Sequence, residues 1–143
     1  MKSILLVDKS RDNADFVEEI LKRYGFYVEV AESGIAAQRL TRDMEFDLIL
    51  MDFSSSIFDP SHGPRDMDQL GEDLGKSTGL IRELRARRVT TPIIVYTSLK
   101  GDLYETASLD AGADDYIFKT DNYSVLLARL NAHLRRRQRD LGS

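Results

Sequence analysis

Residues 47–52 have the sequence DLILMD, in which four apolar residues stand between two aspartates. A short run of this kind, with no polar residue inside it, is typical of a strand that is buried on both faces of a parallel sheet. Three more stretches have the same form, and each ends in a single polar residue, as the first ends in Asp52. They are residues 3–8 (SILLVD), 92–97 (PIIVYT) and 115–119 (DYIFK).

The segments between these runs carry apolar residues at helical spacing. Val28 and Val30 instead occupy alternate positions, which predicts a further strand at an edge of the sheet. The order of strand and helix repeats five times and predicts an α/β fold, a doubly wound five-stranded parallel sheet with five helices on its two faces. The clearest helical face consists of Phe16, Val17, Ile20, Leu21 and Tyr24, ahead of Gly25.

The four polar residues at the strand ends form one chemical set of two carboxylates, a hydroxyl and an ammonium. In an open parallel α/β sheet, ligands bind beyond the carboxyl ends of the strands. Carboxylates can hold a hard cation or take a phosphoryl group, while hydroxyl and ammonium groups bind its oxygens. The pattern therefore predicts a site that handles a phosphoryl group, formed by Asp8, Asp52, Thr97 and Lys119.

The composition is that of a soluble globular domain of 143 residues, with 42% hydrophobic residues, 31% charged residues and a net charge of −4. The mild acidity argues against direct nucleic-acid binding by this domain. Without cysteine the chain has no disulfide, which fits a reducing cytoplasm, and its first apolar run is too short for a signal peptide or a membrane span. We expect a single cytoplasmic domain over residues 1–143 that ends in a basic helix (Arg135, Arg136, Arg137 and Arg139).

Residues 4–8, 47–52, 91–98 and 111–119 together resemble, in order and spacing, the receiver domain of two-component response regulators. The resemblance covers nearly the whole chain except about residues 57–76. It implies a flavodoxin-like fold with strand order 2-1-3-4-5. It also implies a phosphorelay receiver that takes a phosphoryl group from a histidine kinase or a phosphotransfer protein, with Mg²⁺. Such a domain is a switch for a downstream protein or output domain more than an enzyme.

The resemblance also assigns roles to single residues. It implies that Asp52 is the phosphoacceptor, Thr97 the switch hydroxyl, Tyr116 the switch aromatic residue and Lys119 the lysine that balances the new charge. It further implies an interaction face, and a possible homodimer, formed by the fourth helix, the fifth strand and the fifth helix. The implied Mg²⁺ ligands are Asp8, Asp52 and the backbone carbonyl of Ser54.

Lys9 departs from the pattern, because the family has a second acid at this position, which touches the metal directly. Lys9 weakens the predicted metal site, since hard cations are held through carboxylates. Two readings remain open. Lys9 could pair with Asp52 and imitate the metal, which would make the domain a phosphorylation-independent pseudo-receiver, a protein-interaction module. Alternatively, Lys9 turns to solvent while the remaining carboxylates and water hold a weaker metal.

A second departure is an insertion at about residues 57–76, which is rich in Gly, Pro, Asp and Ser. A loop of this length inside a compact domain is usually functional or disordered. It follows Asp52 closely, so it could act as a lid and supply the carboxylate that Lys9 replaces. The alternative is a solvated acidic loop. The candidate acids are Asp59, Asp66, Asp68, Glu72 and Asp73.

Overall fold

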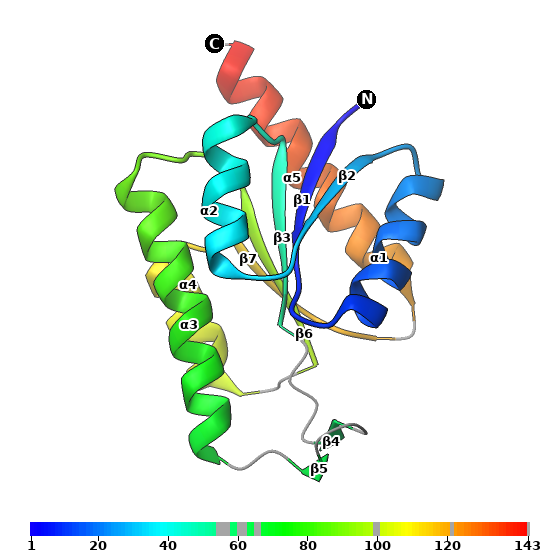
Figure 1. The fold of residues 1–143 in the computed structure, drawn as a ribbon. Coiled ribbons are helices and arrows are strands. Elements are labelled where there is room, and N and C mark those ends of the chain that lie inside the picture. Colours follow the sequence, from blue (N-terminus) through cyan, green and yellow to red (C-terminus); the bar gives the residue numbers. More distant parts are fainter. Residues whose placement is uncertain (54–57, 60–62, 65–66, 99–100, 121, 143) are drawn as a thin grey trace.

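A computed structural model describes residues 1–53, 58–59, 63–64, 67–98, 101–120 and 122–142, with side chains outside the segment 53–73. Five parallel strands form its main sheet in the order β2-β1-β3-β6-β7 (Figure 1). Since β6 and β7 are the fourth and fifth of these strands along the chain, the predicted order 2-1-3-4-5 is confirmed. The strands are β1 (Ser3–Val7), β2 (Tyr27–Ala31), β3 (Leu48–Phe53), β6 (Ile93–Thr97) and β7 (Asp115–Phe118).

Five helices cover the two faces of the sheet, with α1 and α5 on one face and α2, α3 and α4 on the other (Figure 1). Ser33 caps α2, because its side chain accepts a hydrogen bond from the Ala36 amide at 3.1 Å. Gly25 follows α1 with a φ of +90°, as expected from its place after the helical face. The helices are α1 (Arg11–Arg23), α2 (Gly34–Asp43), α3 (Met67–Ala86), α4 (Asp102–Ala111) and α5 (Tyr123–Gly142).

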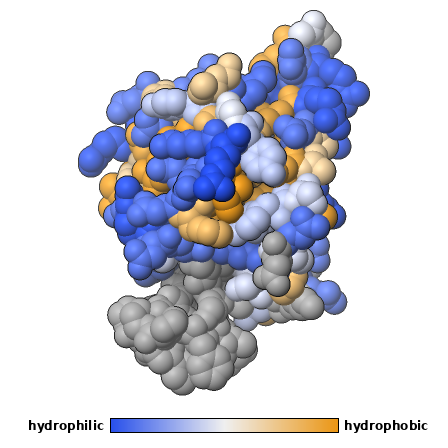
Figure 2. Space-filling view, turned by 90° about the vertical axis from the view of Figure 1, so that its right-hand side faces the viewer, coloured by the Kyte–Doolittle hydropathy of each residue, from blue (hydrophilic) through white to orange (hydrophobic). Residues whose placement is uncertain are grey.

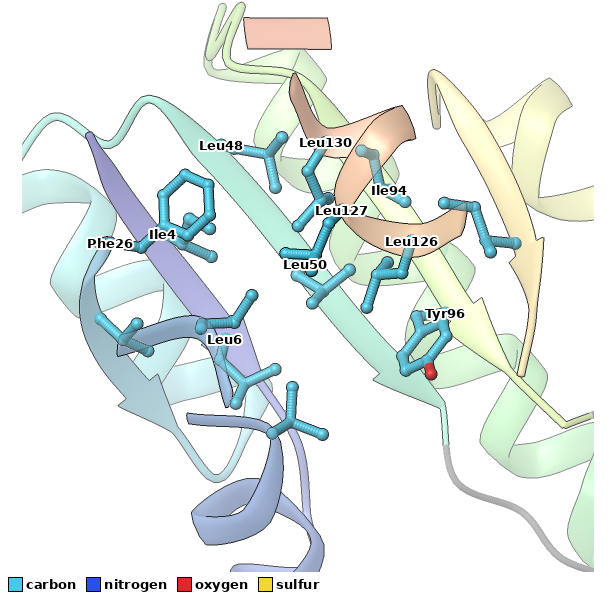
Figure 3. Close-up of a cluster of buried hydrophobic side chains, with 14 of the residues drawn as sticks. Ile4, Leu6, Phe26, Leu48, Leu50, Ile94, Tyr96, Leu126, Leu127 and Leu130 are labelled. Carbon is cyan, nitrogen blue, oxygen red and sulfur yellow. The ribbon is translucent and has the colours of Figure 1, made fainter. Parts of the chain in front are cut away.

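The apolar runs of the strands divide between two hydrophobic cores. Alternate residues of a strand point to opposite faces, so Leu48 and Leu50 pack under α1 and α5, whereas Ile49 and Met51 pack under the other three helices. Figure 3 shows the first core, in which α5 lies over the central strands. Burial on both faces explains why these strands read as unbroken apolar runs.

Polar residues cover most of the side formed by α1 and α5, with hydrophobic residues showing between them (Figure 2). Phe16 of α1 and Val125 of α5 are exposed hydrophobic residues. The ring of Phe16 lies 6.0 Å from that of Tyr123, centre to centre, which joins the two helices at their amino-terminal ends. None of the helices in the described ranges is long and apolar enough to cross a membrane.

The predicted loop at residues 57–76 is shorter in the structure. Two short antiparallel strands, β4 (Phe58–Asp59) and β5 (Gly63–Pro64), pair within it, and α3 already begins at Met67. The expectation of a loop up to residue 76 was therefore wrong for its second half. Its glycines led to that reading, because each glycine inside a helix costs about 1 kcal/mol relative to alanine.

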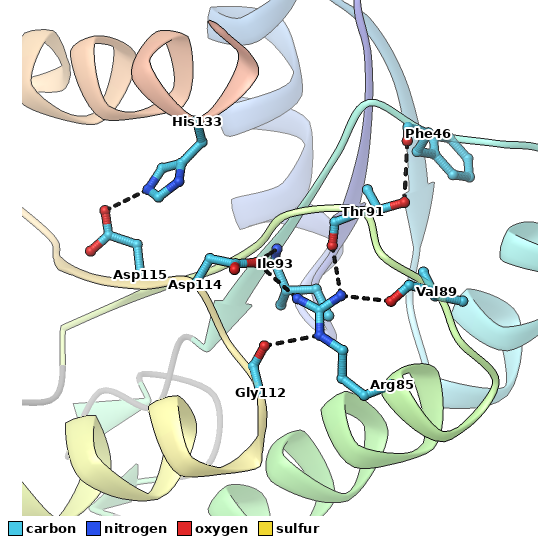
Figure 4. Close-up of polar contacts among 9 residues, drawn as sticks. All are labelled: Phe46, Arg85, Val89, Thr91, Ile93, Gly112, Asp114, Asp115 and His133. Atoms are coloured by element: carbon cyan, nitrogen blue, oxygen red, sulfur yellow. Dashed lines mark hydrogen bonds and ion pairs between the residues drawn. The ribbon is translucent and has the colours of Figure 1, made fainter. Parts of the chain in front are cut away.

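Arg85 forms hydrogen bonds and an ion pair at the amino-terminal edge of the sheet (Figure 4). Its guanidinium donates to the carbonyl oxygens of Gly112 (3.0 Å), Val89 (2.7 Å) and Thr91 (2.8 Å), and it pairs with Asp114 at 2.8 Å. The same Asp114 oxygen accepts the amide of Ile93, the first residue of β6, at 2.8 Å. One side chain from the end of α3 thus connects the starts of β6 and β7.

Candidate functional site

Two carboxylates lie side by side at the carboxyl edge of the sheet. The parallel strands β1 and β3 pair Val7 with Met51, so the next residues, Asp8 and Asp52, are neighbours across the two strands. Both are almost completely buried, with 1% of Asp8 and 6% of Asp52 exposed. Burial of two acids together is costly unless donors or cations compensate them. The residues that provide this compensation therefore define the site.

Lys119 supplies the cation. It follows β7, and its amide donates to the carbonyl of Thr97 at 2.6 Å, which places its side chain beside the end of β6. Its Nζ lies 2.5 Å from Asp52 Oδ1 and 5.2 Å from the ring centre of Tyr96. The Asp52 side chain is fully buried in this pair, and that of Lys119 is 19% exposed. The structure thus brings together the two residues that the sequence pattern placed at separate strand ends.

Asn13 is a member of the site that sequence reasoning missed. It lies in the first turn of α1, where Ser10 caps the helix and accepts a hydrogen bond from the Asn13 amide at 3.4 Å. The side-chain Nδ2 lies 2.5 Å from Asp8 Oδ2 and 2.9 Å from Asp52 Oδ2. The available signal was a polar residue three positions after the cap of the helix that follows Asp8, because that turn faces the strand end.

The environment raises the pKa of both carboxyl groups. Burial first, and then the charge of Asp52, raise the pKa of Asp8 to about 6, against the hydrogen bonds from Ser10 and Asn13 and the charge of Lys119. Burial also raises the pKa of Asp52, opposed by Lys119 and Asn13. With both acids ionised, the contacts among the described residues set two negative charges against the single ammonium of Lys119. The site therefore attracts a further cation.

The residues fit a hard divalent cation. Asp8 Oδ2 and Asp52 Oδ2 both contact the same atom, Nδ2 of Asn13, so the two carboxylates converge on one place. Mg²⁺ is commonly held through one or two carboxylates, with water completing its shell. Within the described ranges no three His, Cys, Asp or Glu side chains gather as metal ligands, so of the residues described there Asp8 and Asp52 are the candidate carboxylate ligands. The predicted ligand Ser54 lies outside the described residues.

The structure separates the two readings of Lys9. Its side chain is exposed, and the ammonium that contacts Asp52 is that of Lys119. The reading in which Lys9 imitates the metal by pairing with Asp52 is therefore not favoured. The candidate acids of the insertion have side chains outside the described part of the chain; they are Asp59, Asp66, Asp68, Glu72 and Asp73.

Thr97 and Tyr116 connect this site to the next strand. Thr97 ends β6 and is fully buried, and the register of β3 and β6 pairs it with Phe53, the residue after Asp52. The half-buried Tyr116 packs against the core under α2, α3 and α4. Burial raises the pKa of Tyr116 to about 12, while a side-chain hydrogen bond with Thr97 acts in the opposite direction. The Thr97 hydroxyl, at the end of the strand beside β3, is thus linked to the aromatic residue of β7.

Comparison with known proteins places these features among bacterial regulators, although no family model matches the chain. The transcriptional regulatory protein CpxR of Escherichia coli K12 is 36% identical over 138 residues, which are 95% of this chain and 50% of CpxR. The response regulator MprA of Mycobacterium sp. (strain KMS) is 32% identical over 97% of this chain and 53% of MprA. The chain therefore spans about half the length of these relatives.

Solved structures match over their full length. The BeF3-activated N-terminal receiver domain of Klebsiella pneumoniae RstA is 30% identical, with a TM-score of 0.74, and the match covers 94% of this chain and 99% of that domain. A two-component response regulator from Clostridium difficile is 26% identical, with a TM-score of 0.73 over 95% of this chain and 98% of that one. Both share the five-stranded architecture of this chain.

Proposed function

The chain belongs to the receiver-domain family of response regulators, and on that premise we propose that Asp52 accepts a phosphoryl group in a phosphorelay. The observation that carries the proposal is the setting of the Asp52 carboxylate. It ends the central strand β3, with the Lys119 ammonium at one oxygen and the Asn13 amide at the other. A buried carboxylate held between an ammonium and an amide is oriented for attack, and both partners favour its ionised form, which is the nucleophile.

In the reaction that we propose, an Asp52 oxygen attacks the phosphorus of a phosphohistidine on a partner kinase or phosphotransfer protein. The new bond joins that oxygen to phosphorus, the bond from phosphorus to the imidazole nitrogen breaks, and the imidazole keeps the electron pair. Lys119 then balances the added charge on the phosphoryl oxygens. Asp8 and Asp52 would hold Mg²⁺, which supplies further positive charge at these oxygens.

Thr97 and Tyr116 would carry the signal away from the site. The Thr97 hydroxyl can donate to a phosphoryl oxygen on Asp52, and it would then change its hydrogen bond with Tyr116. Tyr116 lies on β7, between α4 and α5 in the fold. Exposed apolar residues on these elements, such as Leu103, Phe118 and Val125, support this face as the contact for a downstream protein, an output domain or a second copy. We propose a binding switch more than an enzyme, acting in the cytoplasm.

The test is the intact mass of the protein after incubation with acetyl phosphate and Mg²⁺. The wild type should gain one phosphoryl group, and Asp52→Asn should gain none, because no other acid in the described ranges has this setting. Asp110→Asn is the matched control, since Asp110 is an exposed acid on α4. A phosphoryl adduct on Asp52→Asn at the wild-type level would show that the acceptor is a different residue.

A further inference from the structure

The Asn13 side chain spans the two carboxylates of the site. A primary amide has two N–H donors on one nitrogen. Nδ2 of Asn13 lies 2.5 Å from Asp8 Oδ2 and 2.9 Å from Asp52 Oδ2, so one donor is available for each acid. The other oxygen of Asp8 accepts the Ser10 amide at 2.9 Å, and the other oxygen of Asp52 pairs with Lys119. Three of the four carboxylate oxygens therefore accept a hydrogen bond from the protein itself, and the fourth, Asp52 Oδ1, lies against the Lys119 ammonium.

We propose that Asn13 is a tethered stand-in for the divalent cation, which must displace the Asn13 amide before it can bridge Asp8 and Asp52. The inference rests on the proposed function, since it concerns the cation of the same site. It makes Asn13 a positioning residue that sets the Mg²⁺ concentration at which the site loads.

Competition follows from what the amide and the cation require. Both Oδ2 atoms face Nδ2, and they are the oxygens that the two converging carboxylates would turn toward a cation. A cation that binds both at about 2.1 Å needs the lone pairs that now accept the amide hydrogens. The amide carries no net charge, so it coexists with the Lys119 ammonium on Asp52 without repulsion. It can therefore hold the two acids together in the absence of metal.

The position of Asn13 also determines how its side chain can leave the two carboxylates when a cation binds. It belongs to the first turn of α1 and is only half-buried, so its side chain can turn toward solvent while the helix stays in place. Asn13 could instead rotate its amide by half a turn and offer its oxygen to the cation, as asparagine does in calcium sites. In that case removal of the side chain would weaken metal binding. The sign of the effect thus separates competition from coordination.

The experiment is a titration of Mg²⁺ at pH 8 into the wild type, Asn13→Ala and Asn13→Ser, followed by melting temperature and by amide resonances. We expect Asn13→Ala to reach half-saturation at a Mg²⁺ concentration lower by at least about tenfold, because hydrogen bonds to two charged groups no longer have to be broken. In EDTA its melting temperature should fall below that of the wild type, since the acids lose their shared donor. Asn13→Ser, which keeps one donor, should lie between the two. The control is Asn131→Ala, which removes an exposed asparagine of α5.

Equal half-saturation in the wild type and Asn13→Ala would overturn the inference, and weaker binding by Asn13→Ala would overturn it in favour of coordination. Absence of Mg²⁺ binding in every variant would also overturn it, because no competitor would exist. Phosphorylation of Asp52 is measured separately by intact mass. An adduct on Asp52 with equal metal affinities would leave the proposed function standing without the inference. Tighter Mg²⁺ binding by Asn13→Ala without an adduct on Asp52 would support the inference and contradict the proposed function.

Discussion

Replacement of Lys119 by methionine should expose how much the carboxylate pair depends on its one ammonium. Methionine keeps much of the apolar stem but removes the charge that lies 2.5 Å from Asp52 Oδ1. The Asp52 side chain is fully buried, so water compensates poorly for the lost partner. Removal of one member of a buried ion pair costs about 3–5 kcal/mol of the free energy of unfolding. Asn13 still donates to Asp52, so we expect a loss near the lower end, about 3 kcal/mol at pH 8.

The loss should depend on pH with a defined sign. Lys119 lowers the pKa of both Asp8 and Asp52, so its removal raises the pKa of Asp8 further above the value of about 6 that it has in the folded wild type. A carboxyl group whose folded pKa lies above its unfolded value stabilises the protein below the unfolded pKa. That contribution disappears as the pH rises through the folded pKa. The variant should therefore differ less from the wild type at pH 5 than at pH 8.

Urea unfolding in EDTA, followed by far-ultraviolet circular dichroism at both pH values, measures these differences. The matched control is Lys22→Met, because Lys22 pairs with Glu18 at 3.4 Å on the surface and is 56% exposed. Its replacement should cost about 0.5 kcal/mol or less. If Lys119→Met costs no more than this control, or the same at pH 5 and pH 8, the carboxylates do not depend on the Lys119 ammonium.

Two further predictions concern the framework around the site. Gly112→Ala should lower the free energy of unfolding by about 1–3 kcal/mol, because Gly112 has a φ of +123° and a Cβ there would lie 2.8 Å from Cγ of Arg85. Gly79→Ala, inside α3 with no atom within 4 Å of its Cβ, should instead stabilise by up to about 1 kcal/mol, and urea unfolding measures both variants. Equal effects of the two substitutions would show that neither backbone conformation nor crowding matters at Gly112. Burial alone would raise the pKa of Asp115, but the hydrogen bond with His133 and the other partners of Asp115 lower this pKa overall. The ionised Asp115 therefore stabilises the fold above pH 3.8, its unfolded pKa, and this contribution is lost as the pH falls through the folded pKa. Asp115→Asn should therefore lose about 1–3 kcal/mol at pH 7 and less at pH 3 in urea unfolding, and a loss that grows on acidification would refute the assignment.

The strands could be predicted because a short unbroken apolar run, in a chain where such runs alternate with helical patterns, is typical of a strand covered on both faces. The same reasoning located Asp8, Asp52 and Lys119, since parallel strands bring their carboxyl ends to one edge. The order of the strands in the sheet was implied by the resemblance to receiver domains, since no apolar run shows which strands are neighbours. The start of α3 could not be predicted, because the glycines at 71 and 75 disfavour a helix locally, yet the helix runs through both.

Asn13 was missed for a different reason. A pattern of strand ends identifies residues that follow strands, whereas Asn13 reaches the site from the first turn of a helix. Asparagine near a helix start also has an ordinary local use as a capping residue. Only the orientation of α1 relative to β1 shows that the side-chain amide of Asn13 points at two acids. The exposure of Lys9, likewise, depends on how the chain turns after Asp8, and the spacing of residues along the sequence does not show this turn.

The strand order has a consequence for how the folded protein opens. Asp52 belongs to β3, which has a neighbour on each side, whereas Lys119 follows β7, the edge strand that pairs with β6 alone in the main sheet. Edge elements exchange their amide hydrogens through small local openings, while the most enclosed strands exchange only when the whole domain unfolds. Such a fluctuation of β7 would carry the ammonium away and leave the carboxylate in place. The site would then lose its charge balance transiently, in local openings that are far more frequent than unfolding of the whole domain.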